Sequence, residues 1–328
     1  MRALRTLLIA GSLFVATRVE PQALPAPMLY VSNEGSKSIS VIDPRTNSVI
    51  RTIAVGTRPR GISVSPDGRR VYVALSDEVS QRETGGDRIA VIDAASGKLV
   101  ARYPSGSDPE QFGITPDGRR LYASNEDAGT ASAIDLRTGK VLATMVVGIE
   151  PEGVAVSPDG RWVYVTAETS NSISVIDTRT NKVVSSFLVD VRPRAAVFSR
   201  DGARAYVSTE LGGSVNVIDA AKHEVIATIR LGNGEGKPVG VAISRDGKLL
   251  YVANGRSSSV SVVDVARSRE VATIPVGRRP WGITLSRDGR LLYTANGLSN
   301  DVSVIDVATR RVVATVKVGE RPWGVATR

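Results

Sequence analysis

The chain has 328 residues, of which 42% are hydrophobic and 23% are charged, and its 42 Lys and Arg outnumber its 33 Asp and Glu. This composition is typical of a folded globular protein and excludes a disordered chain. There is no cysteine, which excludes disulfides, cysteine-ligated zinc, iron–sulfur clusters and thiol nucleophiles. The single histidine, His223, excludes metal sites built from several histidines, and a Ser-His-Asp triad could use only that residue.

Residues 1–27 are predicted to be a signal peptide and a short linker. Arg2 and Arg5 precede an apolar run from Leu7 to Ala16, and a proline-containing stretch follows. A short basic segment before roughly 7–15 apolar residues is typical of a secretory signal, whereas a membrane-spanning helix needs about 20. We therefore expect a periplasmic or secreted protein without a transmembrane span in its mature form. An N-terminal membrane anchor is the alternative.

Residues 28–328 consist of one unit repeated seven times. The aspartate that ends each Val-Ile-Asp-like run recurs at spacings of 50, 42, 42, 42, 45 and 42 residues. These aspartates are Asp43, Asp93, Asp135, Asp177, Asp219, Asp264 and Asp306. The glycine of each Asp-Gly turn, from Gly68 to Gly289, recurs at spacings of 50, 42, 42, 45 and 42 residues, and seven of the eight tyrosines share one phase.

Each unit contains four short runs with the period-two alternation and the Val, Ile and Tyr content of β-strands. In the fourth unit the predicted strands are 153–157, 162–167, 172–177 and 182–189. Four strands per unit of this length predict a β-propeller blade. The fold prediction is therefore all-β, a single domain with seven four-stranded antiparallel blades.

The two ends of the repeat region predict how the ring closes. The first unit begins with its second strand at residues 29–33, so its inner strand is missing. The C-terminal segment 321–327 has the sequence of an inner strand. We expect this segment to complete the N-terminal blade, because a closed ring leaves no exposed strand edge between its ends.

Residues present in every unit are predicted to serve the scaffold. The seven aspartates are expected to accept backbone N–H bonds in the following turn, since dispersed single carboxylates cannot form a calcium cage of 6–8 oxygens. The tyrosines are expected to pack between blades, each hydroxyl with a polar partner. His223 is interpreted as a solvated turn residue.

Four segments of the repeats resemble the YVTN signature of a family of propeller repeats: residues 30–33, 122–125, 251–254 and 293–296. Longer segments resemble one subgroup, the periplasmic seven-bladed propellers associated with quinone (PQQ)-dependent alcohol catabolism and its transport genes: residues 108–112, 124–127, 148–153 and 296–302. This resemblance implies an accessory role, with a PQQ-dependent dehydrogenase or a transporter component as a possible partner. It does not imply that the chain binds the quinone.

The candidate site lies where the repeats differ. A proline begins each predicted inner strand, and the residue after it varies and is expected to point toward the central opening. These residues are Arg60, Glu110, Glu152, Arg194, Val239, Trp281 and Trp323. The loop four residues after each repeated tyrosine adds Glu34, Ser76, Glu126, Glu168, Glu210, Gly255 and Gly297.

Together these residues predict a mouth with a charged side and an aromatic side. An apolar wall with a few convergent polar groups is typical of a small-ligand pocket. We expect Arg60, Glu110, Glu152, Arg194, Trp281, Trp323, Glu34, Glu126, Glu168 and Glu210 to bind an amphipathic ligand or a partner protein. The alternatives are that the charged residues only neutralise one another around a water-filled channel and that the tryptophans only plug it.

Two insertions interrupt the repeat. The second unit has eight extra residues within 75–87, and the sixth has three extra within 232–237. Loop growth without a function is the favoured interpretation because long surface loops cost little. A partner contact is the alternative for the longer insertion.

The functional prediction is a non-catalytic binding or scaffold protein, monomeric, with no catalytic residue, metal or cofactor. The alternative is a lactonase-like hydrolase that uses Glu110 or Glu152 as general base, provided that burial raises the pKa of that carboxyl. Single-stranded nucleic-acid binding is a further alternative, since aromatic and basic groups suit it. It is not favoured, because the Lys and Arg residues are spread over many turns, as is typical of a solvated surface.

Overall fold

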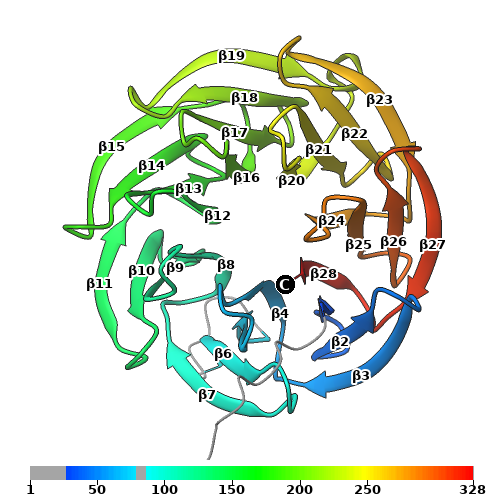
Figure 1. Ribbon diagram of the computed structural model, residues 1–328. Coiled ribbons are helices and arrows are strands. Elements are labelled where there is room, and N and C mark those ends of the chain that lie inside the picture. The colour runs from blue at the N-terminus through cyan, green and yellow to red at the C-terminus, as the bar shows by residue number, and fades with distance from the viewer. Residues whose placement is uncertain (1–26, 79–85, 328) are drawn as a thin grey trace, which may run out of the picture.

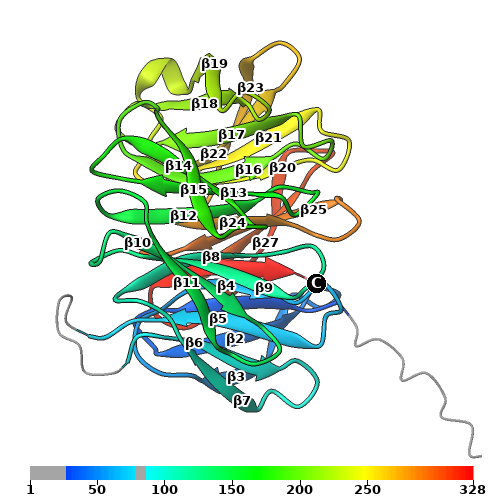
Figure 2. The ribbon, with the colours of Figure 1, turned by 90° about the vertical axis from the view of Figure 1, so that its left-hand side faces the viewer.

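The computed structural model describes residues 27–78 and 86–327 and shows a closed seven-bladed β-propeller (Figure 1). Each blade is a four-stranded antiparallel sheet, as the repeat predicts. The seven sheets surround a central axis, and Figure 2 shows the same ring from the side. The predicted fold class is confirmed.

The strands run from the axis outward in each blade. Blade 1 contains β28 (Pro322–Thr327), β1 (Leu29–Asn33), β2 (Ser38–Asp43) and β3 (Ser48–Ala54). Blade 2 contains β4 (Pro59–Val64), β5 (Arg70–Leu75), β6 (Arg88–Asp93) and β7 (Leu99–Pro104). Blade 3 contains β8 (Pro109–Ile114), β9 (Arg120–Asn125), β10 (Thr130–Asp135) and β11 (Val141–Val146).

Blade 4 contains β12 (Pro151–Val156), β13 (Trp162–Ala167), β14 (Ser172–Asp177) and β15 (Lys182–Leu188). Blade 5 contains β16 (Pro193–Phe198), β17 (Arg204–Thr209), β18 (Ser214–Asp219) and β19 (Glu224–Arg230). Blade 6 contains β20 (Pro238–Ile243), β21 (Leu249–Asn254), β22 (Ser259–Asp264) and β23 (Arg269–Pro275), preceded by a short 3₁₀ turn η1 (Gly232–Gly234). Blade 7 contains β24 (Pro280–Leu285), β25 (Leu291–Asn296), β26 (Asp301–Asp306) and β27 (Arg311–Lys317).

The C-terminal strand closes the ring. β28 pairs antiparallel with β1, so that Leu29 lies opposite Thr327 and Tyr30 opposite Ala326. Figure 1 shows this strand, in red, inside the blue strands of blade 1. The closure predicted from the sequence is therefore observed.

The seven aspartates act in turns, as predicted. Asp43 Oδ1 accepts the backbone N–H of Arg45 at 2.9 Å, and Asp219 Oδ1 accepts that of Ala221 at 2.9 Å. The other five accept a backbone N–H two or three residues ahead in the same way. Bonds of this kind favour the ionised form of a carboxyl group, and the side chain and backbone of Arg45 lower the pKa of Asp43 to about 2.

The repeated tyrosines are buried between blades, but their hydroxyls behave differently from the prediction. Tyr164 Oη bonds Nδ1 of His223 at 2.7 Å, and the His223 ring packs edge-on against Trp162 with a centroid separation of 5.0 Å. His223 is thus a half-buried packing residue, and its interpretation as a solvated turn residue is wrong. The buried Tyr251 hydroxyl has no hydrogen-bond partner among the described residues, so the expectation of a partner for every tyrosine is also wrong.

Adjacent inner strands approach most closely at the second residue after the proline that begins each strand, and most inner strands have glycine there. A Cβ on Gly153 of β12 would lie 2.2 Å from the carbonyl oxygen of Arg194, and one on Gly240 of β20 would lie 2.4 Å from that of Trp281. Real Cβ atoms do not make such contacts. Five of the seven inner strands have glycine at this position, and Gln111 and Ala195 stand there in the other two. The missing side chains let neighbouring inner strands approach closely, which brings the residues after the prolines to a common rim.

Two sequence predictions fall partly outside the described residues. The predicted signal peptide and linker, 1–27, include the undescribed residues 1–26, and the insertion in blade 2 includes 79–85. The insertion in blade 6 contains η1. In the two described ranges, no helix has the length and hydropathy that crossing a membrane would require.

Candidate functional site

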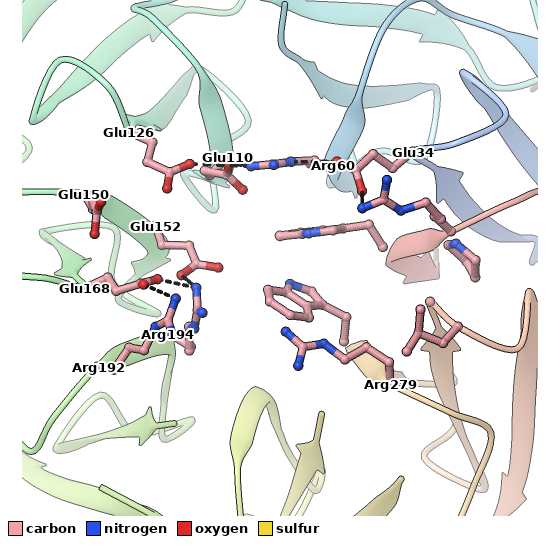
Figure 3. Close-up of a pocket in the computed structure, with 16 residues that line it drawn as sticks. Glu34, Arg60, Glu110, Glu126, Glu150, Glu152, Glu168, Arg192, Arg194 and Arg279 are labelled. Carbon is pink, nitrogen blue, oxygen red and sulfur yellow. Dashed lines mark hydrogen bonds and ion pairs between the residues drawn. The ribbon is translucent and has the colours of Figure 1, made fainter. Parts of the chain in front are cut away.

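A cavity of about 480 Å³ opens at one end of the propeller axis (Figure 3). Nine of the ten predicted site residues line it: Glu34, Arg60, Glu110, Glu126, Glu152, Glu168, Arg194, Trp281 and Trp323. The tenth, Glu210, is fully buried beside the cavity and pairs with Arg194. The divergent positions of the repeat therefore do converge on one opening.

Seven further lining residues were not among the ten predicted site residues: Glu150, Arg192, Arg279, Gly297, Leu298, Arg321 and Pro322. Four of them stand directly before a mouth proline, which is the sequence signal that could have identified them. The backbone at these four positions has positive φ, between 52° and 64°. Such a conformation is uncommon for residues other than glycine and costs about 1 kcal/mol or more, and such strain clusters at functional sites.

Backbone hydrogen bonds join the inner-strand loops to the loops that carry the glutamates. The N–H of Glu126 donates to the carbonyl of Asp108 at 3.0 Å, and the N–H of Glu168 donates to the carbonyl of Glu150 at 2.8 Å. The same bond joins Glu210 to Arg192, also at 2.8 Å. The loops that carry Glu126, Glu168 and Glu210 are therefore held by main-chain hydrogen bonds, which do not depend on the glutamate side chains.

Arg194 is the centre of the larger ion-pair network. Its side chain is 8% exposed; Nε donates to Oε2 of Glu210 at 2.8 Å, and Nη2 lies 2.7 Å from the same oxygen. Nη1 pairs with both Glu152 and Glu168. Although burial alone would lower the pKa of Arg194, the charges of Glu152, Glu210 and Glu168 raise it. Arg194 is thus a permanently charged residue in contact with the carboxyl groups of three glutamates.

Arg60 is the centre of the smaller network, on the other side of Glu152. Its guanidinium pairs with Glu110, and it lies 3.5 Å from oxygens of both Glu34 and Glu126. Glu110 is 3% exposed in this pair, whereas the Glu126 side chain is 30% exposed. Of the carboxylates around Arg60, Glu126 is therefore the one that solvent and a ligand can reach.

The aromatic side of the cavity is formed by Trp281 and Trp323, whose ring centroids are 5.7 Å apart at an angle of 41°. The guanidinium carbons of Arg279 and Arg194 lie 4.8 Å and 5.2 Å from the Trp281 ring centroid. In Figure 3 the head of Arg279 reaches into the cavity toward Arg194. Arg279 makes no ion pair within the described part of the chain, so its donors remain available to a ligand.

Two carboxyl groups of the cavity have raised pKa values. Burial raises the pKa of Glu126 to about 7, and Asp108, Glu168 and Glu150 add to the shift while Arg60 opposes it. Burial also raises the pKa of Glu152, against the opposing charge of Arg194. Glu210 is different: burial would raise its pKa, but the charge and hydrogen bond of Arg194, with Arg192 and Arg279, lower it.

A second cavity of about 200 Å³ continues from the first along the axis. It shares Glu152, Arg194, Trp281 and Trp323 with the mouth. Its other lining residues come from all seven inner strands, and they are apolar or glycine except for Gln111. Val239, the seventh divergent residue, lines this channel and not the mouth. Beyond the four shared residues, the side chains of this channel are therefore mainly aliphatic.

One group of carboxylates could hold a cation. Single oxygens of Asp108, Glu110 and Glu126 lie within 4.8 Å of one another. However, Arg60 pairs with Glu110, and Arg58 Nη1 donates to Asp108 at 3.1 Å. Two guanidinium groups therefore already pair with carboxylates of this group.

Comparisons with known proteins place this geometry beside several families. The family model described as "Lactonase, 7-bladed beta-propeller" matches residues 189–321, and the "Cytochrome D1 heme domain" model matches residues 75–190. Among curated proteins, the PE-PGRS family protein PE_PGRS18 of Mycobacterium tuberculosis is 50% identical over 42 residues, which are 13% of this chain and 9% of that protein. The chain thus spans about a tenth of that relative, a stretch as long as one repeat.

Solved structures share the fold. Hydrazine synthase of Kuenenia stuttgartiensis is 24% identical, with a TM-score of 0.76 over 90% of this chain and 99% of that one. A putative 6-phosphogluconolactonase from Bacteroides fragilis is 19% identical, with a TM-score of 0.75 over 94% and 100%. Another from Bacteroides uniformis is 20% identical, with a TM-score of 0.77 over 92% and 100%.

These comparisons correct the functional prediction. We expected a non-catalytic scaffold protein, and that expectation is wrong: the lactonase family match and the structural similarity to putative 6-phosphogluconolactonases favour the hydrolase alternative. The lack of a nucleophile–base pair in the sequence does not exclude a hydrolase, because a carboxylate can activate water as the nucleophile. The resemblance to YVTN repeats stays a prediction.

The cytochrome match does not fit the chemistry of this cavity. Haem iron in proteins is held by histidine, cysteine, methionine or tyrosine side chains. The described cavity lining has none of these. His223, the one histidine of the chain, lies in the turn between β18 and β19 of blade 5 and bonds Tyr164 of blade 4. The residues present therefore do not suit a haem group.

Proposed function

We propose that the protein is a lactonase-like hydrolase that opens a lactone ring in the cavity at the mouth of the propeller. The observation that carries this proposal is Glu126, a reachable carboxyl group with its pKa raised to about 7 in a cavity with an aromatic wall. A general base is most effective when its pKa is near the working pH. The lactonase family match over residues 189–321 supports the same reaction class.

Each step of the reaction has a group in the cavity. Glu126 takes a proton from a water molecule, whose oxygen adds to the lactone carbonyl carbon. The unpaired guanidinium of Arg279 stabilises the negative charge that forms on the carbonyl oxygen, since fixed donors in a water-poor site are effective there. The bond to the ring oxygen then breaks, and Glu152, protonated because burial raises its pKa, supplies the proton that this oxygen needs.

The predicted general bases were Glu110 and Glu152, and the geometry favours neither. Glu110 is almost fully buried in its pair with Arg60. Glu152 is 7% exposed and paired with Arg194, and its raised pKa suits an acid better than a base. Two carboxyl groups in different environments are a common way to divide acid and base roles.

The test is hydrolysis of a panel of γ- and δ-lactones by the purified protein, and the release of acid measures the rate. We expect activity with a bell-shaped pH dependence, rising near pH 7 as Glu126 ionises and falling as Glu152 loses its proton. Glu126→Gln is expected to lower kcat at least about a hundredfold. Glu224→Gln, at a carboxylate that is 54% exposed outside the cavity, is the control. Absence of hydrolysis of every lactone would refute the proposal.

A further inference from the structure

The cavity has little capacity left to bind an anion. Six glutamates and five arginines line it. Arg60, Arg192 and Arg194 pair with carboxylates, and Arg321 lies 3.6 Å from Glu34. Only Arg279 is unpaired among the described lining residues. A phosphate or carboxylate entering here would have to compete with carboxylates held at fixed positions, and it would meet repulsion from them.

The channel below the cavity is lined mainly by aliphatic side chains, apart from Gln111 and the four residues that it shares with the cavity. Val154, Val241 and Ile283 of three different inner strands line it, and each is only partly buried by the protein. Partly exposed aliphatic groups inside a concave space gain from contact with an apolar ligand, because the contact removes their surface from water. Beyond Glu152 and Arg194, the side chains of the channel therefore favour contact with an apolar group.

The two spaces meet at the proposed reaction site. Glu152 and Arg194 border both spaces on one side, and Trp281 and Trp323 border both on the other. Trp323 is 8% exposed and lines both spaces. A ring held beside Glu126 and Arg279 could thus carry a substituent past the two indoles into the channel.

We infer that the substrate of this site is an uncharged lactone with an extended apolar substituent, whose ring occupies the cavity while the substituent enters the channel beside Trp281 and Trp323. This inference rests on the proposed function. It excludes phosphorylated sugar lactones as preferred substrates. Specificity then comes from burial of the methylene groups of the substrate and from repulsion of anions by the glutamates that line the cavity.

The first experiment compares lactones that differ only in the substituent: δ-valerolactone, δ-octalactone and δ-decalactone, with 6-phosphogluconolactone as the charged competitor. Burial of each methylene group is expected to raise kcat/KM by about fourfold. We therefore expect at least a tenfold preference for δ-decalactone over δ-valerolactone. A higher kcat/KM for the phosphorylated lactone would overturn the inference and leave the hydrolase proposal standing. Failure to hydrolyse any of the four would count against the proposed function.

A second experiment locates the substituent. Ile283→Phe narrows the channel and is expected to bring the ratio of kcat/KM for δ-decalactone to kcat/KM for δ-valerolactone down to about one. Ile226→Phe, on the outer strand β19 where Ile226 is 47% exposed, is the matched control. An unchanged chain-length preference in Ile283→Phe would overturn the inference.

Binding can also be followed without catalysis if Ile283→Phe does not fold. The chain has three tryptophans, so Trp162→Phe leaves Trp281 and Trp323 as the only fluorophores of that type. We expect 3-pentylcyclohexanone, a ketone that cannot be hydrolysed, to change their emission in a saturable way, and cyclohexanone to bind at least tenfold more weakly. Equal binding of the two ketones would contradict occupation of the channel.

Discussion

The side-chain hydroxyl of Thr166 in blade 4 donates a hydrogen bond to the carbonyl oxygen of Arg194 in blade 5, over 3.1 Å. Ser124 Oγ makes the same bond to the Glu152 carbonyl at 2.6 Å. Ser32 Oγ bonds the Arg60 carbonyl at 2.5 Å. The second strand of one blade therefore positions the mouth residue of the next.

This relationship leads to a prediction for Thr166→Val. The substitution keeps the shape of the side chain but leaves a buried carbonyl without its partner, which costs about 1–3 kcal/mol. Because the carbonyl belongs to Arg194, we also expect lactone hydrolysis to fall at least tenfold. Urea denaturation and initial rates measure the two effects.

The matched control is Ser174→Ala in the same blade. Ser174 Oγ donates to the carbonyl of Val147 at 2.5 Å and is also buried, but Val147 carries no mouth side chain. We expect a similar loss of stability with activity retained. Equal losses of activity in both variants would show that the Thr166 bond has no special role at the site.

The second prediction concerns the buried charge of Arg194. Arg194→Met leaves Glu152, Glu168 and Glu210 without their shared cation, and breaking a buried pair in this way costs about 3–5 kcal/mol. The loss should be smaller at pH 5 than at pH 8, because the abandoned carboxylates can then take up protons. Arg45→Met removes a pair in which Arg45 is 70% exposed, and it should change stability by about 0.5 kcal/mol or less. A loss that did not depend on pH would contradict this account.

The third prediction follows from the raised pKa of Glu126. Its pKa is about 7 in the folded protein against a reference of 4.5, so folding favours the protonated form. The contribution of Glu126 to the free energy of unfolding is therefore fully present below pH 4.5 and is lost as pH rises through 7. At one pKa unit per 1.36 kcal/mol, and discounted for partial exposure, the cost above pH 7 is about 1–2 kcal/mol.

Glu126→Gln removes this cost. We therefore expect the variant to melt at a higher temperature than the wild type at pH 8.5, and at about the same temperature at pH 4. Calorimetry at the two pH values measures the difference, with Glu224→Gln as the exposed control. A variant less stable than the wild type at pH 8.5 would show that the pairing of Glu126 with Arg60 outweighs its burial.

The fourth prediction concerns ring closure. A chain that ends before Pro322 lacks β28, exposes the edge of β1 and loses Trp323. We expect its melting temperature to fall by at least about 10 °C, which corresponds to a few kcal/mol for a domain of this size. Trp323→Ala in the full chain separates loss of the side chain from loss of the strand and should cause a smaller fall. An unchanged melting temperature of the truncated chain would contradict the closure.

Much of the site could be predicted from the repeat itself. The residue after each proline was expected at the mouth, and Glu152, Arg194 and Trp281 indeed line the cavity there. The residues before the prolines were missed. Nothing in the local sequence shows that Arg192 and Arg279 have a backbone with positive φ, which depends on the loops packed around them.

The sequence by itself determined the propeller, the number of its blades and the strand that closes it, because period-two alternation and turn residues act locally and recur seven times. Only the tertiary structure decided which carboxyl groups could do chemistry. Glu126 and Glu110 look alike in the sequence, but one is 30% exposed and the other is 3% exposed. Protonation and access depend on burial and on charges from other blades, and these arise only when distant repeats meet around the axis.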